Sequence, residues 1–385
     1  MGVPVAVNGL ALGLSGVASV VLELSPNSKM IMNLAMVATY GSAALLALFI
    51  CDRAWRPRLV MEDFEKPQTS FAYGAGHMTF LFCWLRLVVP RCSQTVAVLG
   101  LWIAAGAQLL ILFSFLKACY RHRCYPEPFW GPPLCDCCVT AIVGAALWHG
   151  GGLTNVEVLL LESFGLAVLC IVIVLPIQVY RTLKSTEVAP NTTVGVLQAP
   201  PSLSALTWGI IVRSRAGGDV FFPRMDNWIT HGLIMASTFC FWVTLFCTWR
   251  RRRVILKKGF GLDWSNFVFP TCSSAVAILQ YTSQRHADPA ASTFSPDTGG
   301  LSADRIYAFA VTALALSVAG LVTLGVFLQT ITNFIWPTKE TSLPTNRLPL
   351  LADDSENNKK ALSKEGNKVA IKIQQQDKEN NFDFA

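Results

Sequence analysis

Long apolar stretches separated by short polar segments dominate the chain. A helix needs about 20 apolar residues to cross the hydrocarbon core of a bilayer. Six stretches meet this requirement with few polar interruptions: Val5–Leu22, Met30–Ile50, Thr95–Leu116, Val156–Val179, Trp228–Trp249 and Ile306–Ile335. Four more contain proline, histidine or acidic residues: Ser70–Val89, Phe129–Trp148, Thr192–Val212 and Leu262–Tyr281. The pattern predicts an all-α polytopic membrane protein with ten transmembrane helices.

The plain and the interrupted stretches alternate along the chain. Stretches three, five, seven and nine hold the Pro, Gly and polar residues, and the first is rich in small residues, with Gly9, Gly13 and Gly16. Irregular helices are tolerated in a membrane where protein or a water-filled cavity surrounds them. We therefore expect five hairpins, with the odd helices inside and the even helices outside. The plainer explanation is that Pro and Gly are commoner in membrane helices than in soluble ones.

Composition and charge agree with a membrane protein and add an orientation. Charged residues make up 14% of the chain and hydrophobic residues 52%, whereas soluble proteins carry about 25% charged residues. These values exclude a disordered chain, a disulfide-stapled mini-protein and a basic nucleic-acid-binding module. The loops on the side of both termini hold 15 Lys and Arg, and the opposite loops hold 8. The positive-inside rule then places both termini in the cytoplasm.

The end of the chain differs from the rest. Residues 337–385 hold 16 of the 55 charged side chains and too few apolar ones to offset the entropy lost on ordering. We expect a transmembrane domain over residues 1–336 and a disordered, polar, cytoplasmic tail over residues 337–385. The tail is either a plain solvated extension or the substrate of a regulatory kinase, for which the candidate acceptors are Thr338, Thr341, Ser342, Ser355 and Ser363.

Short segments on the odd-numbered stretches match the pattern of one known family. They are Gly9-Leu-Ala-Leu-Gly-Leu-Ser-Gly16, Pro67-Gln-Thr-Ser-Phe71, Pro126-Glu-Pro-Phe-Trp-Gly-Pro-Pro133, Ala199-Pro-Pro-Ser-Leu203 and Trp264-Ser-Asn-Phe-Val-Phe-Pro270. In order and placement over about residues 5–330, the chain resembles the tellurite-resistance/dicarboxylate transporter family. This family includes bacterial tellurite-resistance proteins, fungal malate and sulfite transporters, and plant slow-type anion channels.

The resemblance implies a fold, a function and a gate. It implies ten helices, as five hairpins in quasi-fivefold arrangement around a central pore, often in a homotrimer, here in the plasma membrane. It implies a voltage-dependent anion channel or transporter for small inorganic anions or C4-dicarboxylates such as malate, with Phe269 at the position of the family's gating Phe. The alternative within transport is an exporter of sulfite or tellurite-type oxyanions. The expected partners are small anions and the lipid bilayer, without nucleic acid or cofactor.

The interrupted helices also suggest how a pore would hold an anion. Kinks at proline free backbone groups, small residues leave room for a lumen, and freed N–H groups attract anions without trapping them. The candidate pore-lining or kink residues are Gly13, Gly16, Phe71, Gly74, Pro133, Pro200, Pro201 and Pro270. A candidate anion funnel at the cytoplasmic mouth comprises Arg250, Arg251, Arg252, Arg253, Lys257 and Lys258. The plainer explanations are packing for the prolines and membrane topology for the basic run.

Two ionisable residues on the expected inner helices do not fit a simple anion pore. His77 is a candidate for proton coupling, or else a neutral, hydrogen-bonded His. Asp136 should repel anions unless it is paired with a cation, protonated, or placed at the wide cytoplasmic mouth near Arg121 and Arg123. The cysteines near the fifth stretch, which are Cys124, Cys135, Cys137 and Cys138, lack the spacing of a paired metal site, so no metal is expected. The sequence predicts a transport protein rather than an enzyme, and the alternative from another class is a membrane-embedded enzyme or metal-binding sensor.

Overall fold

A computed structural model describes residues 3–24, 28–148, 164–184, 193–215, 223–253, 264–287 and 303–335. These residues form helices and turns, and no strand occurs among them. One compact unit spans Met1–Gln329, and the packing described below is that of this unit. The expected tail, 337–385, and Lys257 and Lys258 of the expected funnel lie outside the described residues.

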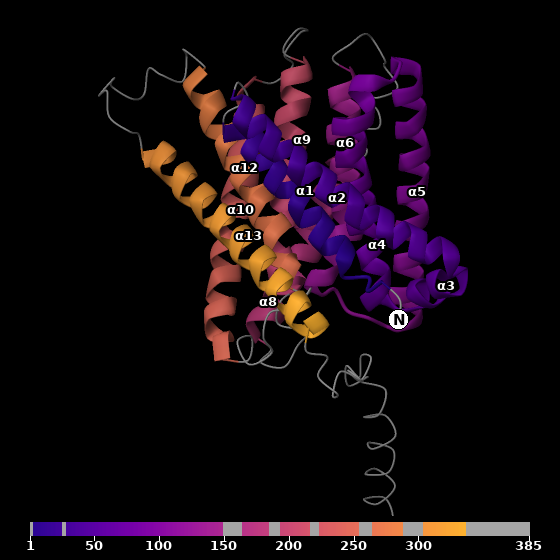
Figure 1. Ribbon diagram of the computed structural model, residues 1–385. Helices are drawn as coiled ribbons and strands as arrows, with labels where there is room; N and C mark the ends of the chain where they lie inside the picture. Colours follow the sequence, from indigo (N-terminus) through magenta and orange to yellow (C-terminus); the bar gives the residue numbers. More distant parts are fainter. Residues whose placement is uncertain are drawn as a thin grey trace, which may run out of the picture. The chain divides into compact units, whose positions relative to one another are not determined.

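The described helices follow the predicted stretches closely. They are α1 (Val7–Leu24), α2 (Lys29–Trp55), α3 (Pro57–Glu65), α4 (Pro67–Cys83), α5 (Gln94–Arg121), α6 (Gly131–Trp148), α8 (Leu175–Lys184), α9 (Ala199–Arg215), α10 (Pro223–Arg250), α12 (Ser265–Ala287) and α13 (Ala303–Ile335), as Figure 1 shows. Five irregular segments extend them: a π-helix after α4 (Trp84–Val88) with a 3₁₀ turn directly behind it (Val89–Arg91), a 3₁₀ turn before α6 (Pro128–Trp130), a π-helix before α8 (Cys170–Val174) and a 3₁₀ segment before α9 (Thr193–Gln198).

Local sequence signals set several helix ends. α3 and α4 begin with Pro57 and Pro67, at a helical position that needs no backbone N–H donor. Arg123, with a φ of 48°, ends α5 in a left-handed turn. This turn lets the Cys124 N–H donate to the carbonyl of Cys119 over 2.9 Å, which satisfies a backbone group at the end of the helix.

The helices are suited to a membrane. Among the described residues, nine helical segments are long and apolar enough to cross a bilayer. The ninth predicted stretch corresponds to α12, which has 23 residues and contains Pro270 but is not among those nine segments. The all-α, multi-pass fold expected from the sequence is confirmed.

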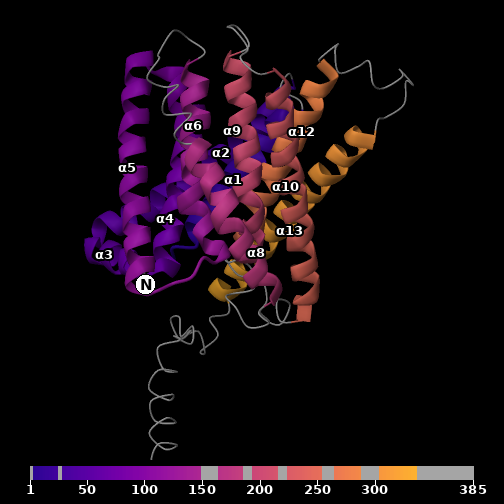
Figure 2. The same ribbon diagram turned by 180° about the vertical axis from the view of Figure 1, so that it is seen from behind.

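The odd-numbered stretches form a closed ring of five helices. α1 packs on α4, α4 on α6, α6 on α9, α9 on α12, and α12 returns to α1. We call these five the inner helices; α2, α5 and α10 pack against α1, α4 and α9 from outside the ring (Figures 1 and 2). Between 50% and 83% of the residues in the apolar windows of α1, α4, α6 and α9 are buried, against 28% to 39% in the outer helices. The predicted alternation of inside and outside helices is confirmed.

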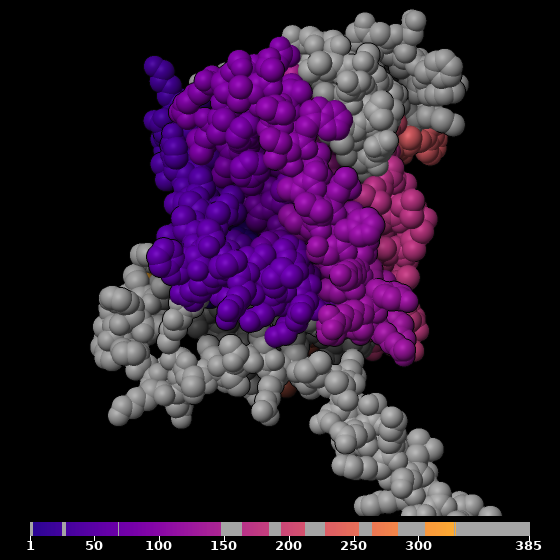
Figure 3. All heavy atoms as spheres, turned by 90° about the vertical axis from the view of Figure 1, so that its right-hand side faces the viewer, coloured from indigo at the N-terminus to yellow at the C-terminus, as the bar shows by residue number. Residues whose placement is uncertain are grey.

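The outer helices present apolar side chains to their surroundings. On α5, for example, Leu110 is 72% exposed and Phe113 is 77% exposed. Figure 3 shows the face that the N-terminal helices form, in indigo and purple, with the short α3 at its lower edge. Such a surface suits contact with lipid chains, which cannot hydrogen-bond.

Candidate functional site

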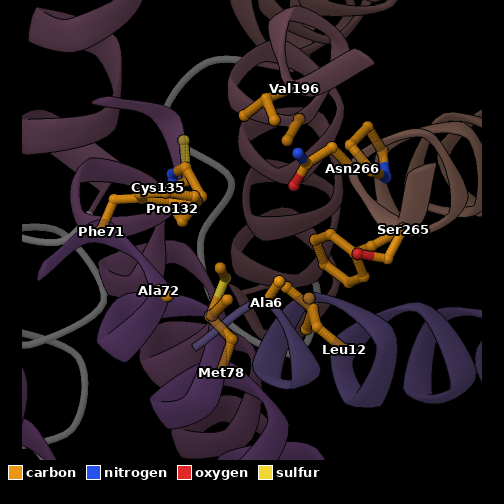
Figure 4. Close-up of a pocket in the computed structure, with 15 residues that line it drawn as sticks. Ala6, Leu12, Phe71, Ala72, Met78, Pro132, Cys135, Val196, Ser265 and Asn266 are labelled. Atoms are coloured by element: carbon orange, nitrogen blue, oxygen red, sulfur yellow. The ribbon is translucent and has the colours of Figure 1, made fainter. Parts of the chain in front are cut away.

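The five inner helices enclose a cavity near the ends at which they begin. Its volume is about 50 Å³, which is room for a few water molecules or one small anion. Every inner helix or the segment leading into it contributes to the wall (Figure 4), which comprises Ala6, Gly9, Leu12, Phe71, Ala72, Ala75, Met78, Pro132, Cys135, Val196, Ala199, Ser265, Asn266, Phe269 and Pro270. The ring of helices is therefore hollow at this depth.

The electrostatics of the cavity come from backbone rather than from charged side chains. Among the residues that the structure describes, no Lys, Arg, His, Asp or Glu lines it, and Ser265 and Asn266 are the polar residues of its wall. The first turns of α6, α9 and α12 border it through Pro132, Ala199 and Ser265. The helix dipole makes this end partially positive, although α6 and α9 each have two prolines in the first turn, which carry no N–H to donate. The cavity thus favours an anion without a fixed charge to hold it tightly.

Phe269 lies at the boundary between the cavity and the packed interior. Its side chain lines the cavity and is 4% exposed. A methyl group added at Gly16, one turn beyond the cavity-lining Leu12, would lie 3.2 Å from Cδ2 of Phe269. The Phe269 ring is also 6.2 Å, centroid to centroid, from Phe82, which follows the cavity-lining Met78 by one turn. An aromatic ring therefore stands where the cavity ends.

The other predicted pore residues divide into two groups. Phe71 and Pro270 line the cavity, as Phe269 does, and Pro270 is inside α12. The glycines lie at close helix contacts. A methyl at Gly13 would meet Val268, one at Gly16 would lie 3.0 Å from Cβ of Cys272, and one at Gly74 would lie 2.9 Å from the backbone nitrogen of Pro133.

The prolines of α6 and α9 correct one expectation. Pro133, Pro200 and Pro201 lie in the first turns of their helices, directly after 3₁₀ segments. A proline at this place interrupts no helical hydrogen bond. These three residues therefore lie at the starts of α-helices rather than inside them, and of the four candidates Pro270 is the one inside an α-helix.

His77 and Asp136 form a buried pair away from the cavity. Nδ1 of His77 lies 2.9 Å from Oδ1 and 2.7 Å from Oδ2 of Asp136. One turn further along α6, the Thr140 hydroxyl donates to Oε1 of Gln108 on α5 over 2.7 Å. Neither member of the pair lines the cavity. The carboxyl group of Asp136 is thus paired with His77, which is a cation only when protonated, and the contact joins α6 to α4.

The arginines of the expected funnel contact α8. Nη1 of Arg250 donates to the Leu183 carbonyl over 3.2 Å, and Nη2 of Arg251 donates to the Thr182 carbonyl over 3.0 Å. The last carbonyls of a helix lack helical donors, so these bonds satisfy them. Arg252 stacks over the ring of Trp249 at 4.2 Å, and Arg253 is exposed.

The cysteines near α6 do not gather into one site. Cys135 lines the cavity, Sγ of Cys137 donates to the Leu134 carbonyl over 2.8 Å, and Sγ of Cys138 lies 3.8 Å from the Ser204 hydroxyl. All twelve cysteines are free thiols. Within the part of the chain that the structure describes, no group of three or more His, Cys, Asp and Glu could hold a metal ion.

Sequence reasoning missed most of the cavity wall, because small apolar residues build it. Ala72, Ala75 and Met78 follow Phe71 along one face of α4. Spacings of three and four residues on an expected inner helix are the signal that would have found them. No such signal marked Asn266, because its place in the cavity wall depends on where α12 begins.

Comparison with known proteins agrees with this geometry. A sequence model of the voltage-dependent anion channel family matches residues 2–334, which is nearly the whole of the compact unit described above. No curated protein matches the chain. A match over most of the chain shows the family, and the apolar helices show the membrane context. The chain belongs to the voltage-dependent anion channel family and is a multi-pass membrane protein of anion transport.

Proposed function

We propose that this protein conducts small monovalent anions along the axis of the inner helices, with Phe269 as the gate. The observation that supports the proposal is the cavity. First turns of inner helices bound it, its described wall has no charged side chain, and it ends at one aromatic ring. Weak attraction suits conduction, because an ion must leave a site as readily as it enters. The helix ends supply attraction of this kind.

The cavity supports a monovalent anion over the C4-dicarboxylates that the sequence also suggested. A malate-like ion carries two carboxylates, and each buried charge is costly unless a partner offsets it. Within the described part of the chain, the cavity wall offers no cation for either charge. A doubly charged oxyanion such as sulfite meets the same obstacle, so chloride and nitrate are the anions to test first.

The gating step follows from the position of one ring. In the described structure, the side chain of Phe269 lies between the cavity and the apolar interior that includes Phe82 and Cys272. An apolar ring in a narrow passage excludes hydrated ions by its volume and by dewetting. Rotation of the ring, or its removal, would connect the cavity with the far side.

Anion-replacement electrophysiology on Phe269→Ala tests this proposal. We expect a chloride current at least about tenfold above wild type, because truncation removes the ring that blocks the axis. Phe241→Ala is the matched control, since Phe241 is also 4% exposed but lies on the outer helix α10. The control should lose stability, by about 3–5 kcal/mol, without a gain of current. Unchanged current in Phe269→Ala protein that reaches the membrane would refute the gate.

The orientation of the channel in the membrane is proposed from the sequence. The charge bias of the loops supports a cavity that opens to the cytoplasm, with both termini on that side. Location in the plasma membrane, assembly as a homotrimer, proton coupling through His77 and Asp136, and phosphorylation of the tail stay predictions.

A further inference from the structure

Arg86 places a cation at membrane depth beyond the cavity. It lies in the π-helix Trp84–Val88 that continues α4, and it follows Phe82 by four residues on the side of α4 that faces Phe269. Its guanidinium carbon lies 5.5 Å from the centroid of the Phe82 ring. Single π-helical turns are rare and occur often at functional sites.

The surroundings of Arg86 are neutral. Nη1 donates to the Ser15 carbonyl over 3.2 Å and to the Thr39 hydroxyl over 3.5 Å, and Nη2 donates to the Ser19 hydroxyl. Among the carboxylates that the structure describes, none lies within 4 Å of the guanidinium. Glu23, one turn beyond Ser19 on α1, accepts a hydrogen bond from Gln280.

These bonds orient Arg86 without neutralising it. A guanidinium has five N–H groups, and the bonds to Ser15, Thr39 and Ser19 use three of them. The N–H of Nε and one N–H of Nη2 remain, and the residue is partly exposed. A cation at membrane depth is costly and is normally offset by a counter-charge. If Arg86 only joined α1 to α4, a neutral hydrogen-bonding side chain would be sufficient. The positive charge therefore indicates a role other than joining the two helices.

The depth of Arg86 places it on the far side of Phe269 from the cavity. Along α1, the cavity reaches Gly9 and Leu12, Phe269 approaches Gly16, and Arg86 is bound at Ser15 and Ser19. Along α4, the order is Met78 in the cavity, then Phe82 against Phe269, then Arg86. Both helices give the same sequence of cavity, aromatic ring and cation.

We propose that Arg86 is a binding site for a small anion on the far side of the Phe269 ring. The inference rests on the proposed function for its role in transport, but the site itself does not. A small anion accepts from the remaining N–H groups and supplies the missing counter-charge. Nitrate and carboxylates, with two coplanar oxygens, fit a guanidinium edge better than chloride does.

Chloride-dependent thermal stability of purified, full-length protein tests the site without requiring conduction. Chloride is titrated against gluconate at constant ionic strength, because a ligand that binds the folded state raises the melting temperature. We expect Arg86→Gln to raise the half-saturating chloride concentration at least about tenfold, which is about 1.4 kcal/mol. Arg86→Lys keeps the charge and should stay within about threefold of wild type. Equal chloride dependence in wild type and Arg86→Gln would overturn the proposal.

A second variant covers the case in which Arg86→Gln does not fold. Ser19→Asp keeps the guanidinium but places a carboxylate beside it, as a tethered competitor of the anion. We expect the chloride dependence to be lost, while a purely structural Arg86 would leave it unchanged. Chloride currents of Phe269→Ala separate the two proposals. A chloride-dependent thermal shift that requires Arg86, without any current in Phe269→Ala, would refute the channel but support the anion site. A current in Phe269→Ala, with the same thermal shift in wild type and Arg86→Gln, would support the channel but refute the site.

Discussion

The closest backbone approach between α4 and α6 gives a sharp test of the ring of inner helices. At Gly74, an added methyl would lie 2.9 Å from N of Pro133, 3.0 Å from Cα of Pro133 and 3.1 Å from the carbonyl carbon of Pro132. All three are backbone atoms, which cannot rotate away as the end of a side chain can. Relief to an ordinary contact of about 3.4 Å requires the two helices to separate by about 0.5 Å, and such overpacking costs about 1–3 kcal/mol.

The same separation would act on the buried pair three residues further along α4. The 2.9 Å bond between Nδ1 of His77 and Oδ1 of Asp136 crosses the same interface. Lengthening by about 0.5 Å would bring this contact beyond normal hydrogen-bond distance and would bring the 2.7 Å contact with Oδ2 to the upper end of that range. We therefore expect Gly74→Ala to lose stability through the clash and through this bond together.

Gly106→Ala is the matched control for Gly74→Ala. Gly106 lies on α5, is exposed, and a methyl there has no neighbour within 4 Å. Both substitutions gain helix propensity of about 1 kcal/mol, so the difference between them isolates the clash. Equilibrium unfolding in detergent should show Gly74→Ala less stable than Gly106→Ala by about 1–3 kcal/mol. Stabilities within about 0.5 kcal/mol of each other would show that α4 and α6 do not approach as closely as described.

The remaining predictions concern the two sets of charged residues. Asp136→Ala leaves His77 buried without its partner and should cost about 3–5 kcal/mol in unfolding experiments, whereas Asp136→Asn, which keeps a hydrogen-bonding oxygen, should cost less; equal costs would contradict the pairing. Arg251→Gln removes a charged hydrogen bond to the Thr182 carbonyl and should cost about 1.5–3 kcal/mol, with the exposed Arg253 as the control through Arg253→Gln. A loss of chloride flux in both arginine variants, with no loss of stability in either, would instead favour the funnel.

The layering of the fold was readable from sequence because the bilayer separates two kinds of helix. A helix that faces lipid must be uniformly apolar and regular, while one that faces protein is free to hold Pro, Gly and polar residues. α2 and α5 are of the first kind, with 28% and 33% of their apolar windows buried, and α6 and α9 are of the second, with 83% in each. The alternation therefore predicted which helices form the inner ring. The cavity lies among these helices.

What sequence did not reveal depends on helix starts and on distant partners. Whether Pro200 kinks a span or begins one depends on the 3₁₀ segment Thr193–Gln198 before it, and apolar content alone does not mark that junction. His77 and Asp136 are 59 residues apart, and Arg251 lies 69 residues from the carbonyl that it binds. Their partners depend on how different helices pack together. Periodicity along one helix does not specify that packing.

The scarcity of charge in the chain has different consequences on the two sides of Phe269. On the cavity side, the described wall attracts an anion through helix ends and not through charged side chains, an effect that fades within a turn and holds no ion for long. On the far side, Arg86 is an oriented cation whose bound partners in the described structure are all neutral. In the proposed pathway, an anion released by rotation of Phe269 therefore passes from weak to stronger attraction. Because such a gradient slows exit on the far side, the strength of the Arg86 site would set the rate of conduction once the ring has moved.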